Sequence, residues 1–336
     1  GISRFCNKQL KLLDAPFMLN GRELNVTASI GVSVYGEDAQ TTTDLIRNAD
    51  IAMYQAKKRG RNQYAIFSSE LHRDISENIE IENRLRLAIR KRQIEVYFQP
   101  QVQLMHSEIV GFEALARWTD KEMGVISPQK FITIAEDTGL ISDLGDLILD
   151  KALSQFKQWH EAKPSLTLSV NLSASQLQDD DLIPLLKRKI SEFAINPHQI
   201  KLEITEDIFI SNIDTSIQIT SQLKKLGFQI SLDDFGTGYS SLSYLKDFDI
   251  DELKIDRSFV DHIETSERNK AIVSAMLVMA HVLSIDCIVE GVETEQQLIE
   301  LQKLGCTLFQ GYFFYRPMPA NGIDLLLQPD LPVPIG

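Results

Sequence analysis

The sequence Gln-Ile-Ser-Leu-Asp-Asp-Phe-Gly-Thr-Gly-Tyr occupies residues 229–239, and the rest of the chain can be organised around it. Its first four residues are typical of a short buried strand. Asp233 and Asp234 follow this strand. Neighbouring side chains on a strand point to opposite faces, so the two carboxylates converge only where the strand ends and turns. Gly236 and Gly238 predict such a turn.

The paired carboxylates need a partner of opposite charge. Two like charges held this close repel unless a cation lies between them, which makes Asp233 and Asp234 a candidate bridge between two divalent metals. For the pair alone, a solvated Asp-Asp turn followed by a glycine loop is the more ordinary interpretation. The remainder of the chain reverses that preference.

Strand-like runs alternate with helical stretches from residue 93 onward. Eight runs have the apolar and β-branched character of strands: residues 94–102, 109–118, 166–172, 200–205, 229–232, 252–255, 285–289 and 307–314. Helical stretches separate most of them, at residues 128–137, 141–161, 182–193, 213–226, 241–246, 268–283 and 295–304. This alternation over about 250 residues predicts an α/β fold, a TIM-like (β/α)8 barrel.

One strand of the predicted barrel must run against the others. The first two runs are joined only by residues 103–108. A parallel crossover needs about a dozen residues or more. We therefore expect a TIM-like barrel with one antiparallel strand.

A small α+β segment precedes the barrel at residues 1–68. It combines a hairpin turn at Asn20-Gly21, strands at 26–34 and 63–67, and an amphipathic helix at 42–59. Residues 69–91 then predict a linker helix, and residues 92–330 the barrel domain. A plain connector is the simpler interpretation of the linker, and a coiled signalling helix is the alternative.

A polar residue lies near the downstream end of nearly every predicted barrel strand. These residues are Glu113, Asn171, Glu203, Glu206, Asp233, Asp234, Lys254, Glu290, Glu293 and Gln310. One such residue is usually solvated or a helix cap, but seven successive strands that each supply one indicate an active face. Oxygen ligands without His or paired Cys indicate Mg²⁺ or Mn²⁺ and argue against zinc.

Composition narrows the range of partners. The net charge of −13 argues against nucleic-acid duplexes and anionic lipid, although bound cations can reverse the local sign at a site. The three cysteines have no paired spacing and predict reduced thiols. The longest uncharged run, residues 271–285, is too short to span a bilayer. We expect a cytoplasmic chain without membrane contact, whose parent protein could still be membrane-anchored.

Three motifs in the first segment are similar to the C-terminal half of the GGDEF family of diguanylate cyclases. They are Ala28-Ser-Ile-Gly-Val-Ser-Val-Tyr35, Leu45-Ile-Arg-Asn-Ala-Asp50 and Ala52-Met-Tyr-Gln-Ala-Lys-Lys-Arg-Gly-Arg-Asn62. The resemblance implies that the family's signature loop, which holds GTP and metal, belongs upstream of these residues. We therefore expect no cyclisation of GTP by this partial domain.

The barrel residues resemble a second family, the EAL domains. The motifs are Glu113-Ala-Leu115 with Arg117, Asn171-Leu-Ser, Glu203-Ile-Thr-Glu206, Asp233-Asp-Phe-Gly-Thr-Gly-Tyr-Ser-Ser-Leu242, Leu253-Lys-Ile-Asp256, Glu290-Gly-Val-Glu293 and Gln310-Gly-Tyr. The resemblance covers about residues 90–325 and implies metal-dependent hydrolysis of cyclic di-GMP to linear pGpG in bacterial second-messenger signalling.

The EAL resemblance also implies a role for each site residue. The first of two metals would be held by Glu113, Asn171, Glu203 and Asp233, and the second by Asp233 and Asp234. Lys254 would contact the attacking water or developing charge, Glu290 would act through a water on the metal, and Gln310 would orient a water. Ca²⁺ should inhibit, because its larger and looser shell misplaces the metals.

Three further residues would hold the dinucleotide, with Arg117 on the phosphate that is not cut. Gln99 and Leu115 would complete this set. The alternatives are that Gln99 fills hydrogen bonds within the barrel, that Leu115 is core, and that Arg117 pairs with a barrel carboxylate.

The role of Glu293 has two interpretations. It could accept hydrogen bonds from Ser240, Ser241 or the amides of the loop after the paired aspartates, or it could cap a helix that begins near Thr294. The apolar helix at residues 268–283 predicts a homodimer contact near that loop, which would couple assembly to metal binding.

Two classes of function remain. The intact motifs favour an active phosphodiesterase, and a non-catalytic cyclic di-GMP receptor is the alternative. Turnover of cyclic di-GMP with Mg²⁺ would distinguish them.

Overall fold

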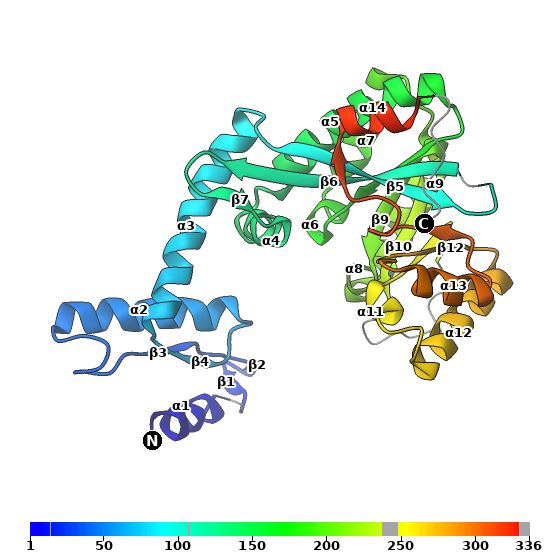
Figure 1. Ribbon diagram of the computed structural model, residues 1–336. Helices are drawn as coiled ribbons and strands as arrows, with labels where there is room; N and C mark the ends of the chain where they lie inside the picture. The colour runs from blue at the N-terminus through cyan, green and yellow to red at the C-terminus, as the bar shows by residue number, and fades with distance from the viewer. Residues whose placement is uncertain (14, 107, 237–247, 329–336) are drawn as a thin grey trace. The chain divides into compact units, whose positions relative to one another are not determined.

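The computed structural model of the chain describes residues 1–13, 15–106, 108–236 and 248–328. The chain divides into two compact units, Gly1–Arg84 and Leu85–Gly336 (Figure 1). Within the described residues, no helix is both long and apolar enough to cross a membrane.

The N-terminal unit contains short strands and two longer helices. Its elements are α1 (Ile2–Lys11), β1 (Phe17–Leu19), β2 (Arg22–Leu24), β3 (Ile30–Val32), α2 (Thr42–Lys58), β4 (Tyr64–Ile66) and α3 (Ser69–Arg90), of which α3 continues into the second unit. The predicted hairpin is confirmed: β1 pairs antiparallel with β2, and Asn20 and Gly21 have the positive φ values of 51° and 76° that such a turn requires.

Helix α2 packs closely on the parallel pair β3–β4. A Cβ atom at Gly31 would lie 1.9 Å from the carbonyl oxygen of Ala49, so only glycine permits this approach. Ala52, Ala56 and Ala65 form the small core. The strand predicted at residues 26–34 is only partly formed, because regular pairing is confined to β3.

Eight strands close the barrel of the second unit. They are β5 (Glu95–Gln103), β6 (Glu108–Asp120), β8 (Thr167–Asn171), β9 (Ile200–Thr205), β10 (Gln229–Phe235), β11 (Glu252–Ile255), β12 (Asp286–Val289) and β13 (Leu308–Phe309). Neighbours from β6 to β13 pair in parallel, and β5 pairs antiparallel with both β6 and β13. The predicted barrel and its single reversed strand are therefore confirmed.

Two edge pairings and one shortened strand depart from the prediction. β7 (Gly124–Ile126) pairs with β6, and β14 (Met318–Pro319) pairs with β5. The last predicted strand was expected to reach residue 314 but ends at Phe309. The chain turns there because the amides of Phe314 and Tyr315 both donate to the carbonyl of Gly311.

In the described residues of this unit the helices after α3 are α4 (Pro128–Thr138), α5 (Ile141–Ala162), α6 (Ala174–Leu177), α7 (Leu182–Phe193), α8 (Glu206–Ser211), α9 (Ile213–Lys225), α11 (Arg257–Val260), α12 (Glu267–Leu283), α13 (Glu295–Lys303) and α14 (Ala320–Leu326). The longer ones match the predicted ranges, whereas the short helices α6, α8, α11 and α14 were missed because they span too few residues to show periodicity. The helix predicted at residues 241–246 lies outside the described residues. Figure 1 shows α14 beside α5, to which it is joined by a 2.6 Å hydrogen bond from Trp159 Nε1 to Asp324 Oδ1.

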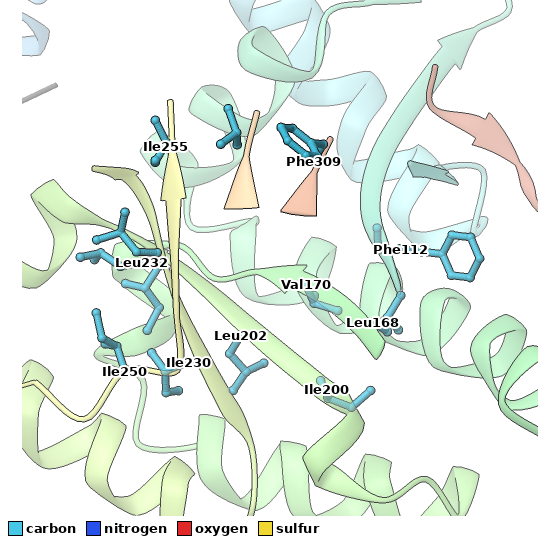
Figure 2. Packing of buried hydrophobic residues seen from close by; sticks show 14 of the residues in the cluster. Phe112, Leu168, Val170, Ile200, Leu202, Ile230, Leu232, Ile250, Ile255 and Phe309 are labelled. Carbon is cyan, nitrogen blue, oxygen red and sulfur yellow. The ribbon is translucent and has the colours of Figure 1, made fainter. Parts of the chain in front are cut away.

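Strand alternation sorts the barrel into an apolar outer face and a polar interior. Along β8, Leu168 and Val170 join the hydrophobic cluster that the helices cover, as Figure 2 shows. Ser169 lies between them, is fully buried, and accepts a 3.5 Å hydrogen bond from Gln101 of β5 across the interior. The same alternation on the other strands places polar side chains inside the barrel.

Candidate active site

A lysine ammonium lies at the centre of the polar cluster inside the barrel. Nζ of Lys254, on β11, lies 2.7 Å from Glu290 Oε1 and 2.9 Å from Glu203 Oε2. It also lies 3.2 Å from Asp233 Oδ2 and 3.8 Å from Glu113 Oε1. The four carboxylates belong to β6, β9, β10 and the residue after β12, so barrel closure brings them together.

The cluster carries more negative than positive charge. Burial alone would lower the pKa of Lys254, but the carboxylates, Glu113 and Glu203 foremost, hold that pKa well above its usual value. Burial, followed by the Glu113 carboxylate, raises the pKa of Glu203 well above its usual range. Burial also raises the pKa of Glu290 to about 8, although the ammonium opposes this shift. Like charges this close favour the binding of further cations.

Glu113 is held on both of its carboxylate oxygens. Nδ2 of Asn171 donates to Oε1 at 2.8 Å, and Nε2 of Gln310 donates to Oε2 at 2.5 Å. Burial alone would raise the pKa of Glu113, but the Lys254 ammonium and these two donors bring it below its usual value. The carboxylate is therefore fixed in orientation and favoured in its ionised form.

The paired aspartates lie where the backbone of β10 becomes irregular. The register of β10 against β11 shifts between Leu232 and Phe235, and Asp234 has a φ of 55°. The amide of Asp234 donates to Oδ1 of Asp233 at 2.9 Å. Burial, and then the Asp233 carboxylate, raise the pKa of Asp234. Both aspartates still lie within β10, which runs to Phe235. The strand predicted to end at Leu232 is therefore three residues longer, and the irregular backbone at Asp234 lies inside it.

Glu206 contacts the start of the loop that follows the paired aspartates. It is 5% exposed, and its Oε2 accepts a 2.9 Å hydrogen bond from the amide of Gly236. The sequence placed Glu206 among the polar strand-end residues without a role for it. The signal that pointed to it was its position at the end of β9, next to the strand that carries Asp233.

Glu293 has a different set of contacts from the one expected. Its carboxylate lies 3.7 Å from Nη1 of Arg257, and both side chains are largely exposed. Ser240 and Ser241, the expected hydrogen-bond partners, lie outside the described residues. The helix cap is Thr294, whose hydroxyl accepts from the amide of Gln297. The alternative in which Glu293 is the cap is therefore wrong.

A cleft opens above the cluster and consists of two adjoining cavities. One of about 230 Å³ is lined by Gln99, Lys254, Glu290, Glu293 and Gln310, among others. The other, of about 660 Å³, has Arg117 and Asn171 in its lining together with many apolar side chains. Glu113, Leu115 and Asp233 line both cavities. Every predicted site residue except Glu203 and Asp234 therefore lines this cleft.

Arg117 is half-buried at the wall of the larger cavity. Its Nη1 donates to the carbonyl of Ala116 at 2.8 Å, and its guanidinium lies 5.7 Å from the centre of the Tyr97 ring. Burial lowers its pKa somewhat. No carboxylate in the described part of the chain forms an ion pair with it, which leaves the guanidinium able to bind an anion in the cleft.

Residues 82–317 match the family described as the EAL domain. The chain belongs to the EAL domain family. Residues 1–63 match the family described as the diguanylate cyclase, GGDEF domain. The EAL and GGDEF resemblances drawn from the motifs are confirmed, whereas the exact domain boundaries stay a prediction.

Two curated relatives match nearly the whole chain. The chain is 39% identical over 315 residues to the bifunctional diguanylate cyclase/cyclic di-GMP phosphodiesterase MucR of Pseudomonas aeruginosa, covering 94% of this chain and 46% of MucR. It is 38% identical over 320 residues to the cyclic di-GMP phosphodiesterase NbdA of the same organism, covering 95% of this chain and 41% of NbdA. The chain thus spans less than half the length of these relatives.

A solved structure shares the fold of the EAL domain. The PaMucR phosphodiesterase in its c-di-GMP complex is 38% identical and superposes with a TM-score of 0.70, covering 73% of this chain and 99% of that one. The EAL barrel with its one reversed strand is thus the fold of this chain.

Membership in the EAL family implies dependence on a divalent metal. Among the described residues, no group of three or more His, Cys, Asp or Glu side chains is arranged so that it could hold a metal ion. The residues nevertheless fit hard cations: the donors are oxygens, and Glu203 Oε1 is buried without a hydrogen-bond partner among the described residues. Four carboxylates also face a single ammonium.

Proposed function

We propose that this chain hydrolyses cyclic di-GMP to linear pGpG. The observation that carries the proposal is the ammonium of Lys254 among four carboxylates at the floor of a cleft, where the strands of a barrel end. The relatives MucR and NbdA are named as cyclic di-GMP phosphodiesterases, and the PaMucR structure holds c-di-GMP. These names support the choice of substrate.

Mg²⁺ or Mn²⁺ would occupy two metal positions. Glu113, Asn171, Glu203 and Asp233 would hold the first ion, and Asp233 and Asp234 the second. When bound, the two ions would supply charge neutralisation at the phosphate and a more acidic water. Ca²⁺ would inhibit, because its longer bonds and variable coordination suit the fixed carboxylates less well.

The chain's own groups would act on the water and on the phosphate. The water oxygen forms a bond to phosphorus while the bond to the ribose 3′ oxygen breaks, which leaves a 5′ phosphate and a 3′ hydroxyl. Lys254 would stabilise the negative charge that develops, since its ammonium is held in place by the carboxylates. Glu290, which hydrogen-bonds to this ammonium and lines the cleft, would orient the water. Gln310 would orient a second water.

The cleft wall would hold the rest of the dinucleotide. Arg117 would bind the phosphate that is not cut, because a guanidinium forms paired hydrogen bonds to phosphate oxygens. Leu115 would pack against the ligand, and Gln99 would donate or accept a hydrogen bond at the smaller cavity. Glu293 would help to hold the loop that follows Asp234.

A homodimer through the barrel domain would complete the assembly. Helix α12 exposes Val278 and Val282, which are 61% and 74% accessible, and a second copy would cover them. The chain would work in the cytoplasm, without a nucleic-acid duplex or a membrane surface as partner, as its charge of −13 favours.

Incubation of the purified chain with cyclic di-GMP and Mg²⁺ tests the proposal, with the products separated by chromatography. We expect pGpG. Binding of cyclic di-GMP without pGpG would instead indicate the receptor alternative. In a parallel incubation with GTP we expect no cyclic di-GMP, because the GGDEF resemblance implies that the loop that holds GTP belongs upstream of the matched residues.

A further inference from the structure

We propose that Gln101 is a positioning residue that sets the orientation of the Gln310 amide and, through it, of the Glu113 carboxylate. This inference rests on the proposed function. Gln101 lies on β5, two residues after Gln99, so both side chains point into the barrel. It is fully buried and is not part of the cleft lining, so it acts only through its neighbours.

A hydrogen-bonded chain of amides leads from Gln101 to Glu113. Nε2 of Gln101 donates to Oε1 of Gln310 at 3.1 Å. Nε2 of Gln310 then donates to Oε2 of Glu113 at 2.5 Å and to Oε1 of Gln99 at 3.3 Å. Gln99 in turn donates to the carbonyl of Tyr315 at 3.1 Å. Two hydrogen bonds therefore separate Gln101 from the carboxylate.

The donor of Gln101 favours one of the two orientations of the Gln310 amide. An amide has one donor end and one acceptor end, whereas an ionised carboxylate only accepts. If the Gln310 amide turned over, its carbonyl oxygen would face the Glu113 carboxylate and its NH₂ group would face the NH₂ group of Gln101. Both contacts would be repulsive, so Gln101 favours the orientation that binds Glu113.

The acceptor Oε1 of the Gln101 amide has no visible role, which indicates that the useful group of this side chain is its Nε2 donor. Oε1 of Gln101 is buried and has no hydrogen-bond partner among the described residues. A buried acceptor without a partner costs about 1–3 kcal/mol, which an apolar side chain would avoid. At Gly111, the register partner of Gln101, a Cβ atom would lie 2.4 Å from Thr167 Oγ1 and 3.1 Å from Gln101 Oε1, so the glycine gives space to both side chains.

The test replaces Gln101 by methionine, which has a similar shape and no donor. We expect kcat for cyclic di-GMP to fall about tenfold with KM within about twofold, because a misdirected Glu113 affects the reaction more than substrate binding. We also expect Mn²⁺ binding, measured by calorimetry without substrate, to weaken about tenfold. Unchanged kcat and unchanged Mn²⁺ binding would overturn the proposal.

A matched control is Gln199→Met. Gln199 is also a buried glutamine whose Oε1 has no partner among the residues that the structure describes, but it donates to the carbonyls of Pro164 and Leu166, away from the site. We expect this variant to lose thermal stability and to keep the kcat and Mn²⁺ affinity of the parent. An equal loss of Mn²⁺ affinity in both variants would show that Gln101 supports the fold and does not position Gln310.

A double variant tests whether Gln101 acts through Gln310. Contributions along a single chain of contacts are not additive, so Gln101→Met combined with Gln310→Met should bind Mn²⁺ no more weakly than Gln310→Met alone. Additive losses would overturn the proposed route. If Gln101→Met does not fold, Gln101→Leu removes the same donor with a different shape.

Mn²⁺ calorimetry also separates this proposal from the proposed function. If the parent chain makes no pGpG but Gln101→Met weakens Mn²⁺ binding, the enzyme assignment fails and the positioning role stands. If the parent makes pGpG and Gln101→Met has the same kcat and Mn²⁺ affinity as the parent, the enzyme assignment stands and the positioning role fails.

Discussion

The barrel interior contains two buried lysines, Lys254 and Lys201, whose surroundings differ in net charge. Lys254 lies among four carboxylates near the strand ends. Lys201, which is 8% exposed, forms an ion pair with Glu252 and with no other carboxylate in the described part of the chain. Ser231 Oγ donates to the second oxygen of the Glu252 carboxylate at 3.0 Å. Glu252 and Lys254 lie two residues apart on β11, so one strand contributes to both clusters.

The balance of charge distinguishes the Lys201 pair, which is structural, from the Lys254 cluster, which we propose to be reactive. In the Lys201 pair one charge cancels the other, and nothing further needs to bind. In the Lys254 cluster three negative charges remain, which is unfavourable in a buried site unless cations enter or the acids take up protons. Burial is the largest cause of the raised pKa values of Glu203 and Glu290, and the neighbouring carboxylates raise them further.

The largest expected effect is the removal of metal. Excess EDTA should abolish pGpG formation, because the Lys254 cluster would then keep its unbalanced charge, and added Mg²⁺ should restore it. Chromatography of the products measures both. Full turnover in EDTA would contradict the proposed difference between the clusters, because the Lys254 cluster would then need a cation no more than the Lys201 pair does.

Replacement of the central lysine should come next. Lys254→Ala should lower kcat by roughly 100- to 1,000-fold, because the group that stabilises developing charge is lost. Cyclic di-GMP should still bind, as isothermal calorimetry with Ca²⁺ would show. An equal loss of binding and turnover would reassign Lys254 to substrate holding.

Replacement of the other lysine should change stability and leave the chemistry alone. Lys201→Met leaves the Glu252 carboxylate buried without its charge partner, which should lower the free energy of unfolding by about 3–5 kcal/mol. Urea unfolding measures the loss, and kcat of the folded fraction should match the parent. The double variant Lys201→Met with Glu252→Met should recover most of the stability. A kcat as low as that of Lys254→Ala would contradict the structural role.

Glu206 should matter only to the Lys254 cluster. Glu206→Met removes the acceptor that binds the amide of Gly236, so the loop after Asp234 would be held less firmly. We expect the Mg²⁺ concentration for half-maximal activity to rise about tenfold, with rescue at high Mg²⁺. A lower activity that high Mg²⁺ does not restore would argue against this role.

The smallest effect should come from Glu293→Gln. The ion pair between Glu293 and Arg257 is exposed, and exposed ion pairs contribute about 0–1 kcal/mol to the free energy of unfolding. We expect a rise of about twofold to fivefold in the Mg²⁺ midpoint and no change in the melting temperature. An unchanged midpoint would remove Glu293 from the loop-holding role.

Strand patterns predicted the residues that the structure brings together around Lys254. Glu203, Asp233, Lys254 and Glu290 lie at or near strand ends, whereas Glu113 lies in the middle of β6. Polar side chains are unexpected in such buried runs and are therefore conspicuous. Gln101, Ser169, Lys201, Ser231 and Glu252 lie deeper in the barrel and were missed. Within a strand, a polar residue at alternate positions also fits a solvated face, so the pattern alone does not mark it as interior.

The sequence by itself determined the elements, the direction of β5 and the residues that gather at the strand ends, because periodicity and loop length are local properties. Only the tertiary structure decided how these residues meet. Barrel closure brings Gln101 to Gln310, 209 residues away, and places Lys254 among carboxylates from several strands. Such contacts depend on strand register around a closed barrel, which no local segment specifies.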